Sequence, residues 1–365
     1  MKKFIYKDVQ FFYSIDNPQN LDTINFNNHQ LNNLRIFCKN NFPGILGKKE
    51  YELYFYEGRE INAVTFLDNK GNGIIAFPSE FFTLLRDIIE KLIYAEPSIK
   101  IFDIYTKAEA NNLVNSLFEY IIIFVITHEL SHLERGHCGY LNKIGIYCSE
   151  NEMHFEEDDE EKNFLLQTIE LDADTNAIFL TLNYFINHTI DLIKENKLDK
   201  NDCIPFLNEI QDIICSMYLL NILFNFDNNS VEFKTYLENF YSEKHPFPSL
   251  RILNILSQIE VYMENFLSPD ELAFVYNNAI GKCISIDRIF FANGDFKKSL
   301  IAVSSTKDGS LHLQKLYKNW NVIINDIQKF SFIQLEKICI PKTMSYWVDE
   351  NGNMSETMFK TEKVK

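Results

Sequence analysis

The sequence predicts an α+β protein that is mainly helical, with a small β-sheet ahead of a helical core. Residues 51–77 contain short apolar runs interrupted by an Asp-Asn-Lys-Gly turn at 68–71, a pattern typical of strands joined in a hairpin. From residue 81 to about 266, apolar residues recur at the spacing of buried or amphipathic helices. The prediction is therefore a helical core with the small sheet upstream of its central helix.

Strands are predicted at 51–56, 61–67 and 73–77. Helices are predicted over Phe81–Tyr94, Glu109–Arg135, Asn163–Asn187, Asn208–Asn225 and Leu250–Phe266. The fourth of these is apolar on almost all sides, which predicts a central position. Further on, we expect a helix from Pro269, another over Leu311–Asp326 and a hairpin near Tyr346. These patterns divide the chain into an α/β part at 1–80, a helical core at 81–266 and a C-terminal region of unknown role at 267–365.

The composition narrows the classes of function. A net charge of −16 argues against nucleic acid as a partner, because phosphate binding needs clustered Lys and Arg. The seven cysteines are scattered without a CxxC pair, which favours a reducing cytoplasm over a disulfide framework. The N-terminus lacks the apolar core of a signal peptide. No run reaches the ~18–20 apolar residues of a membrane span, so no stable membrane insertion is expected.

The most specific motif is His128-Glu129-Leu-Ser-His132, an HExxH sequence inside the helix predicted at 109–135. Positions i and i+4 share one face of a helix, so both imidazoles can bind one ion. Glu129 then lies beside that ion as a general base for water. A glycine, Gly136, stands where the helix should end. The motif predicts a catalytic Zn²⁺ site with His128 and His132 as ligands.

A catalytic zinc needs a third protein ligand and an open position for water. His137 follows His132 by five residues, whereas the metzincin pattern HExxHxxGxxH places its last ligand six residues on. His137 is therefore expected to pack or hydrogen bond at the helix end. Glu170 lies on a later helix with its own apolar period, and we take it as the third ligand.

Asp174 stands one helical turn after Glu170, on the same face. A carboxylate in that position can hold a zinc histidine through its other ring nitrogen. Asp172 lies off this face and is not chosen. The small residues Ala173 and Ala177 would let this helix approach the motif helix closely.

The tetrahedral oxyanion of peptide hydrolysis needs a hydrogen-bond donor. His245 is the candidate, because it precedes the Pro246-Phe-Pro248 turn that stiffens the backbone; a plain turn residue is the alternative. Arg251 could anchor this turn to an acid near the site. The segment Glu150–Glu161 holds eight carboxylates without Lys or Arg. It is a solvated loop, or else a lid or an attraction site for a basic substrate.

Together these motifs resemble the gluzincin zinc peptidases, in particular the HtpX and CAAX-prenyl-protease group. That group shows HExxH, then Glu-x-x-Ala-Asp, here at 170–174, then a His-Pro phrase followed by Arg-Ile, here at 245–252. The resemblance covers about residues 55–265 and implies a zincin-like helical catalytic core, with the small sheet upstream of the HExxH helix. Asn62 and Ala63 look like that group's Asn-Ala strand, which implies a peptide substrate lying antiparallel along an edge strand. The chain departs from the group in lacking membrane spans and in a longer segment at 81–127.

A looser resemblance links the chain to the Lit-type phage-exclusion peptidases, which cut a cytosolic host protein. We therefore expect a soluble, cytoplasmic zinc endopeptidase that acts on a protein or peptide, with a defence or toxin-like role implied by the looser resemblance alone. The alternative is a zinc-binding regulatory or interaction protein that keeps the fold without turnover. In either case a regulatory protein partner is compatible with the sequence.

Overall fold

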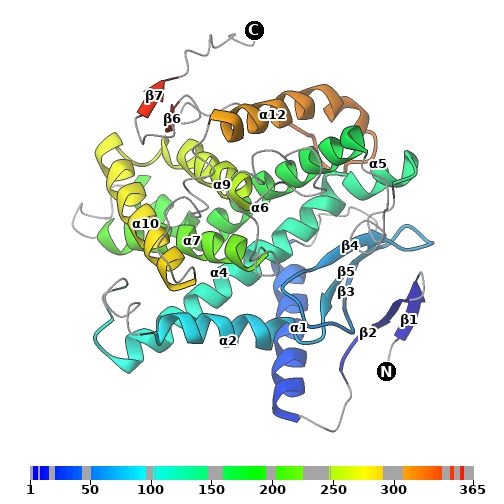
Figure 1. The fold of residues 1–365 in the computed structure, drawn as a ribbon. Coiled ribbons are helices and arrows are strands. Elements are labelled where there is room, and N and C mark those ends of the chain that lie inside the picture. The colour runs from blue at the N-terminus through cyan, green and yellow to red at the C-terminus, as the bar shows by residue number, and fades with distance from the viewer. Residues whose placement is uncertain are drawn as a thin grey trace. The chain divides into compact units, whose positions relative to one another are not determined.

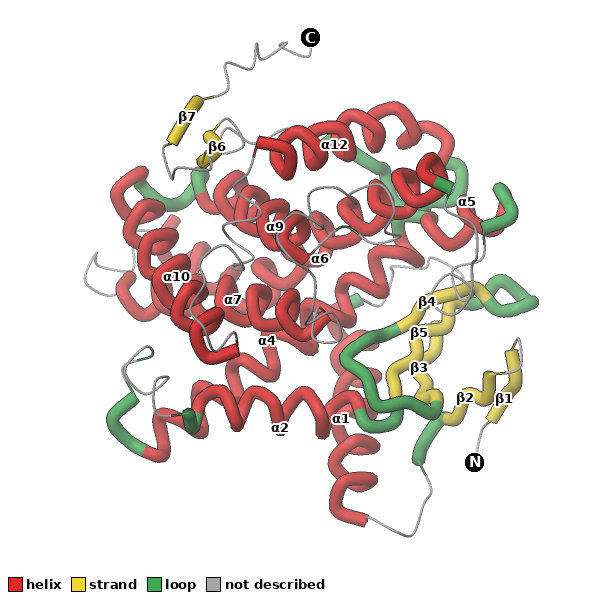
Figure 2. Tube along the Cα trace, in the orientation of Figure 1, coloured by secondary structure: helices red, strands yellow, loops and turns green. Residues whose placement is uncertain are grey.

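The computed structural model is mainly helical with a small sheet (Figures 1 and 2), which confirms the predicted α+β, mainly helical class. It describes residues 3–6, 9–15, 21–42, 51–95, 102, 104–146, 159–194, 203–224, 246, 248–290, 307–338, 346–348 and 354–356.

The chain divides into two compact units. Unit 1 comprises Met1–Glu157 and Ile323–Glu336, and unit 2 comprises Asp158–Val322 and Lys337–Lys365. The segment boundaries expected near residues 80 and 266 do not coincide with this division. A short piece near the C-terminus therefore belongs to the unit that carries the HExxH motif.

The sheet of unit 1 has five strands in the order β1-β2-β3-β5-β4. Their bounds are β1 Lys3–Tyr6, β2 Val9–Phe12, β3 Tyr51–Tyr56, β4 Val64–Leu67 and β5 Gly73–Pro78. β3 and β5 run parallel, and the other neighbours are antiparallel. β4 and β5 form the expected hairpin around the 68–71 turn, and β4 is an outer strand of the described sheet.

The strand expected at 61–67 begins only at Val64. In the observed register Val64 lies opposite Ala76, so the next partner pairs would involve Phe77 and Pro78. Proline has no N–H to donate to a ladder, and the observed pairing ends at Val64–Ala76, two residues short of Pro78. The N–H of Ala63 instead bonds to Oδ1 of Asn62, at 2.9 Å.

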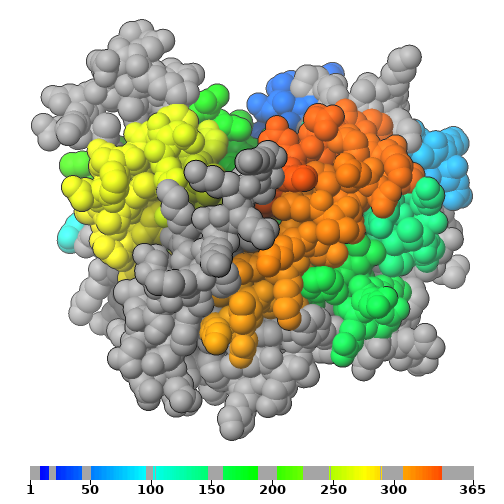
Figure 3. Space-filling view, turned by 90° about the horizontal axis from the view of Figure 1, so that it is seen from above, coloured from blue at the N-terminus to red at the C-terminus, as the bar shows by residue number. Residues whose placement is uncertain are grey.

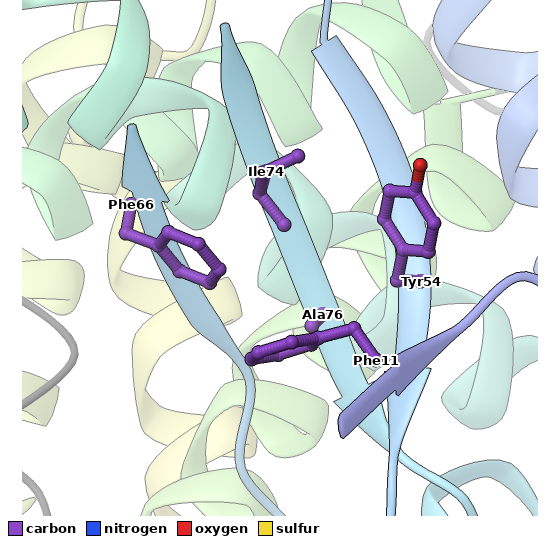
Figure 4. Close-up of a cluster of buried hydrophobic side chains, with 5 residues drawn as sticks. All are labelled: Phe11, Tyr54, Phe66, Ile74 and Ala76. Carbon is purple, nitrogen blue, oxygen red and sulfur yellow. The ribbon is translucent and has the colours of Figure 1, made fainter. Parts of the chain in front are cut away.

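Alternate residues of the strands supply the two faces of the sheet. One face carries a cluster of buried side chains drawn from four strands (Figure 4): Phe11, Tyr54, Phe66, Ile74 and Ala76. On the other face, Phe55 and Phe77 pack their rings against Phe82, at the start of α2 (Phe81–Ile93), with centroids 6.2 and 5.5 Å away. Helix α1 (Leu21–Asn41), which the sequence analysis did not identify, also contacts β3 and α2.

Helix α4 (Lys107–Glu134) carries the HExxH motif and contacts α2, β4 and β5. It starts two residues before the expected Glu109, because Thr106 and Glu109 form a capping box. Among the described helices, α4 is the one that is long and apolar enough to cross a membrane. However, 78% of its apolar stretch is buried inside the structure. That burial indicates a core helix.

Gly73 allows α4 to approach the sheet closely. A Cβ atom on this residue would lie 2.6 Å from Cδ1 of Leu133, one residue after the motif. A larger residue at position 73 would therefore require the Leu133 side chain to move.

Unit 2 contains α6 (Glu160–Lys194), α7 (Cys203–Phe224), α9 (Pro248–Met263), α10 (Pro269–Phe290) and most of α12 (Lys307–Ile327). α7 contacts both α9 and α10 and is buried along most of its length, which confirms the central position expected for it. α10 and α12 lie at the surface, as the yellow and orange atoms of Figure 3 show. The terminal hairpin is present as β6 (Tyr346–Val348) and β7 (Met354–Glu356).

Four cysteines of the described residues are buried free thiols: Cys38, Cys138, Cys215 and Cys283. Burial raises the pKa of the Cys38 thiol to about 12. A thiol with such a pKa is protonated and unreactive at neutral pH.

A buried histidine makes the stability of unit 2 depend on pH. His312 on α12 is buried, and its Nε2 lies 2.7 Å from Oε1 of Gln167 on α6. Burial lowers the pKa of His312 from 6.5 to about 4. The unfolded chain therefore takes up a proton between these values that the folded chain does not, so stability is complete above about pH 6.5 and falls as the pH drops.

We expect His312→Gln to remove this contribution, which amounts to about 1.4 kcal/mol per pH unit inside the window. Urea unfolding of the chelator-treated protein at several pH values between 7 and 4.5 measures it. His29→Gln is the matched control, because His29 is exposed on α1. Equal pH slopes for wild type and His312→Gln would contradict the assignment.

Candidate metal centre

The two histidines of the HExxH motif direct the same ring nitrogen toward each other. Nε2 of His128 and Nε2 of His132 are 3.1 Å apart on one face of α4. Two nitrogens bound to a tetrahedral zinc at 2.0–2.1 Å would be roughly 3.3–3.4 Å apart. The pair therefore already has nearly the separation of two ligands of one ion.

The hydroxyl groups of Thr127 and Ser131, in and next to the motif, do not compete for the face that carries the two histidines. Thr127 donates its hydroxyl to carbonyls one turn back on α4, Ile123 and Phe124, and Ser131 donates to the Thr127 carbonyl at 2.6 Å. These hydroxyls are satisfied within their own helix. Glu129 is buried, which is rare for a carboxylate without a specific role or partners.

His137 is fully buried, and its Nδ1 lies 3.1 Å from Nδ1 of His132. It begins the short helix α5 (His137–Lys143), which follows α4 after a sharp corner. This agrees with the expectation that His137 makes a hydrogen bond at the end of the motif helix. Its partner is the second ring nitrogen of a predicted metal ligand.

Gly136 forms the corner between α4 and α5, with φ at 81°. A Cβ here would lie 2.5 Å from the backbone of Phe330 and Ser331. That backbone is tied to the end of α4, because the Phe332 N–H and the Ser331 hydroxyl both donate to the Glu134 carbonyl, at 2.9 and 3.1 Å. The corner thus requires glycine for its conformation and for its space.

In unit 2, α6 carries Glu170, half-buried, and Asp174, fully buried. Both oxygens of Asp174 accept hydrogen bonds from Arg251 on α9, at 2.6 and 2.8 Å. The guanidinium also lies 4.9 Å from the centre of the Phe224 ring. Asp174 is therefore an acid to which Arg251 anchors the start of α9, and its contact with a zinc histidine stays a prediction.

Further polar contacts join α6 to α9 and α12. The Asn254 amide on α9 donates to the Leu171 carbonyl and to the Thr175 hydroxyl, at 3.4 and 3.3 Å. Tyr317 on α12 donates its hydroxyl to Oδ1 of Asn254, at 2.6 Å. Because these groups are buried, a rotation of α6 would leave them without partners. The face of α6 that carries Glu170 is set by this network.

His128, His132 and Glu170 form a group of side chains that could hold a metal ion, each with one ligand atom. Two imidazoles and a carboxylate are the donor set of a catalytic zinc with one open position. The residues present therefore fit the expected ion. Asp172, not chosen as a ligand, is fully buried on α6.

Several predicted residues are placed differently or not described. His245 lies outside the described residues, as does the part of the acidic segment before Asp159. Asn62 and Ala63 precede β4 and are not in a strand. The sequence analysis did not predict that residues 330–332 pack against the end of α4, because the sequence carries no signal for this contact. It also missed the Thr106–Glu109 capping box, which the Thr-x-x-Glu spacing could have revealed.

Comparison with protein families, with characterised proteins and with solved structures finds no match to this chain.

The Arg251–Asp174 pair can be tested by a double-mutant cycle. Arg251→Met should destabilise the protein by about 3–5 kcal/mol, because it leaves a buried carboxylate without its partner. Adding Asp174→Leu should recover much of this loss. Urea unfolding measures both.

The exposed pair Lys329–Asp326 is the control, and Lys329→Met should cost less than about 1 kcal/mol. A loss for Arg251→Met no larger than this would show that the buried pair has no special part in stability.

Proposed function

We propose that the protein is a zinc-dependent endopeptidase, with zinc held by His128, His132 and Glu170. The observation that carries this proposal is the pair of Nε2 atoms 3.1 Å apart on a buried helix, with Glu129 next to His128. The sequence resembles zinc peptidases, and a group of side chains that could hold a metal ion supports the proposal.

The donor set favours a catalytic zinc over a structural one. Structural zinc sites use four ligands, mostly cysteines, and leave no position open. Here the described cysteines are not part of the candidate group. Three ligands leave one position for water or substrate, and a neighbouring carboxylate has a use only if that position reacts.

Zinc in this site would lower the pKa of water and polarise the scissile carbonyl. Glu129 takes the proton of the attacking water and passes it to the leaving amine. His245 is retained as the proposed donor to the oxyanion of the tetrahedral intermediate. The Arg251–Asp174 contact helps to keep the helix that carries Glu170 in place, and Asp174 is retained as the proposed partner of a zinc histidine.

The substrate is proposed to be an extended peptide that adds to the sheet beside β4. This strand is the outer one of the described sheet and contacts α4, and an edge strand offers backbone groups to a peptide. The Cys138 thiol on α5 lies 3.8 Å from the Thr65 carbonyl. Because this contact occupies the Thr65 carbonyl, we propose that the peptide pairs ahead of Thr65, next to Asn62 and Ala63.

The proposed setting is the cytoplasm, with a cytosolic protein as the substrate. The buried free thiols support a reducing compartment. A defence or toxin-like role rests on the looser resemblance to the phage-exclusion peptidases.

Metal binding tests the first step. The purified protein should contain one zinc per chain by elemental analysis. His128→Ala and His132→Ala should each remove it, because two remaining ligands do not hold zinc during purification. His29→Ala, at an exposed histidine of α1, should keep it. Stoichiometric zinc in the double variant of His128 and His132 would refute the site.

Glu129→Gln tests catalysis apart from binding. The amide cannot accept the proton from water, so this variant should keep its zinc and lose proteolysis. The readout is the set of new protein N-termini in cells after expression. Glu119→Gln, on an exposed position of the same helix, should cut as wild type does. Unchanged cleavage by Glu129→Gln would show that another base works; the absence of cleavage by the zinc-loaded wild type would favour a non-catalytic binding protein.

A further inference from the structure

We infer that His137 is a positioning residue for His132: it holds the second ring nitrogen of that ligand and so decides which nitrogen meets the metal. This inference rests on the proposed function. It assigns to an imidazole the part that a carboxylate, a carbonyl or water commonly takes next to a metal-binding histidine.

Both nitrogens of His132 have a defined neighbour. Nε2 lies 3.1 Å from Nε2 of His128, and Nδ1 lies 3.1 Å from Nδ1 of His137. The ring therefore has one side toward the candidate ion and one side toward α5. A flip of the ring would break both contacts.

Proton positions follow from this arrangement. A metal-binding nitrogen must present a lone pair, so the neutral ring of His132 carries its proton on Nδ1. That N–H donates to Nδ1 of His137. The neutral ring of His137 then carries its own proton on Nε2. With Nε2 of His132 on a metal, this hydrogen bond would hold His132 in the tautomer that binds through Nε2.

The orientation of His137 is enforced by the corner between α4 and α5. The side chain is fully buried and cannot swing into solvent. Gly136 turns the chain at a φ of 81° against the Phe330–Ser331 backbone. Phe330 also covers α5, since a Cβ on Gly139 would lie 3.1 Å from its side chain. A segment 197 residues after Glu134 in the chain thus holds the corner, and with it the ring of His137.

A neutral imidazole differs from a carboxylate in this position. A carboxylate would add a negative charge near the ion and make His132 a stronger donor. With His137 the ligands contribute a single negative charge, that of Glu170. An ion bound there would keep more of its positive charge, which would favour polarisation of a carbonyl.

Three substitutions at His137 separate hydrogen bonding from packing. His137→Phe fills the space without an acceptor. His137→Asn places an amide oxygen at the δ position, where Nδ1 of the histidine stands. His137→Gln places its amide one bond farther out. The measurements are zinc affinity by competition with a chromophoric chelator, the visible spectrum of the cobalt(II)-substituted protein, and the thermal unfolding midpoint.

His137→Phe should weaken zinc binding by about 10–100-fold and change the cobalt spectrum. His137→Asn should restore affinity to within a few-fold of wild type, and His137→Gln should not. If His137→Phe does not fold, the comparison of Asn with Gln decides alone. Wild-type affinity in His137→Phe or in His137→Gln would overturn the inference. If His137→Asn and His137→Gln lose zinc affinity equally and their unfolding midpoints fall equally, the inference is overturned and His137 acts through packing.

His132→Ala in the same assay separates this inference from the proposed function. Loss of zinc in His132→Ala with wild-type binding in His137→Phe would leave the metal site standing and remove His137 from it. Full zinc binding in His132→Ala would refute the metal site, and the inference with it.

Discussion

The packing of α4 against the sheet of unit 1 is the contact on which the candidate site depends. A helix that presents His128, Glu129 and His132 on one face must bury its other sides, and the run of apolar residues ahead of the motif does this. At this contact Gly73, the first residue of β5, leaves room for the Leu133 side chain. The same contact places α4 beside β4, the strand on which an extended substrate is proposed to pair.

In unit 2, buried polar groups fix the rotation of α6 about its axis. α6 must present a carboxylate at a set rotation, and apolar packing alone specifies rotation weakly. Buried amides and hydroxyls on α9 and α12, together with the Arg251–Asp174 pair, define it instead, because each would lose a partner if the helix turned. Buried pairs of this kind add little net stability. Their value here lies in selecting one arrangement of the helices.

At the end of α4, the candidate site depends on contacts with the α4–α5 corner. A predicted metal ligand, His132, is held from behind by His137, and His137 is held by a glycine corner that closes only against Phe330 and Ser331. The C-terminal segment at 323–336 is therefore part of unit 1, and it reaches the residues next to the motif. The region beyond 267, whose role the sequence left open, contributes here to the surroundings of the candidate site.

Local patterns were sufficient for part of this picture. The HExxH spacing, the apolar period of α6 and the Asp-Asn-Lys-Gly turn predicted α4, α6 and the β4–β5 hairpin, because each depends on residues a few positions apart. Contacts between distant segments needed the tertiary structure. The sequence suggested Asp174 as the partner of a zinc histidine, and this contact stays a prediction. The structure adds that Arg251 donates to both oxygens of Asp174 and that His137 meets His132. The short reach of β4 likewise depends on Pro78 of its neighbour, and the need for glycine at 136 depends on a backbone almost two hundred residues away. Periodicity shows which face of an element is buried, but only the fold decides which side chains meet there.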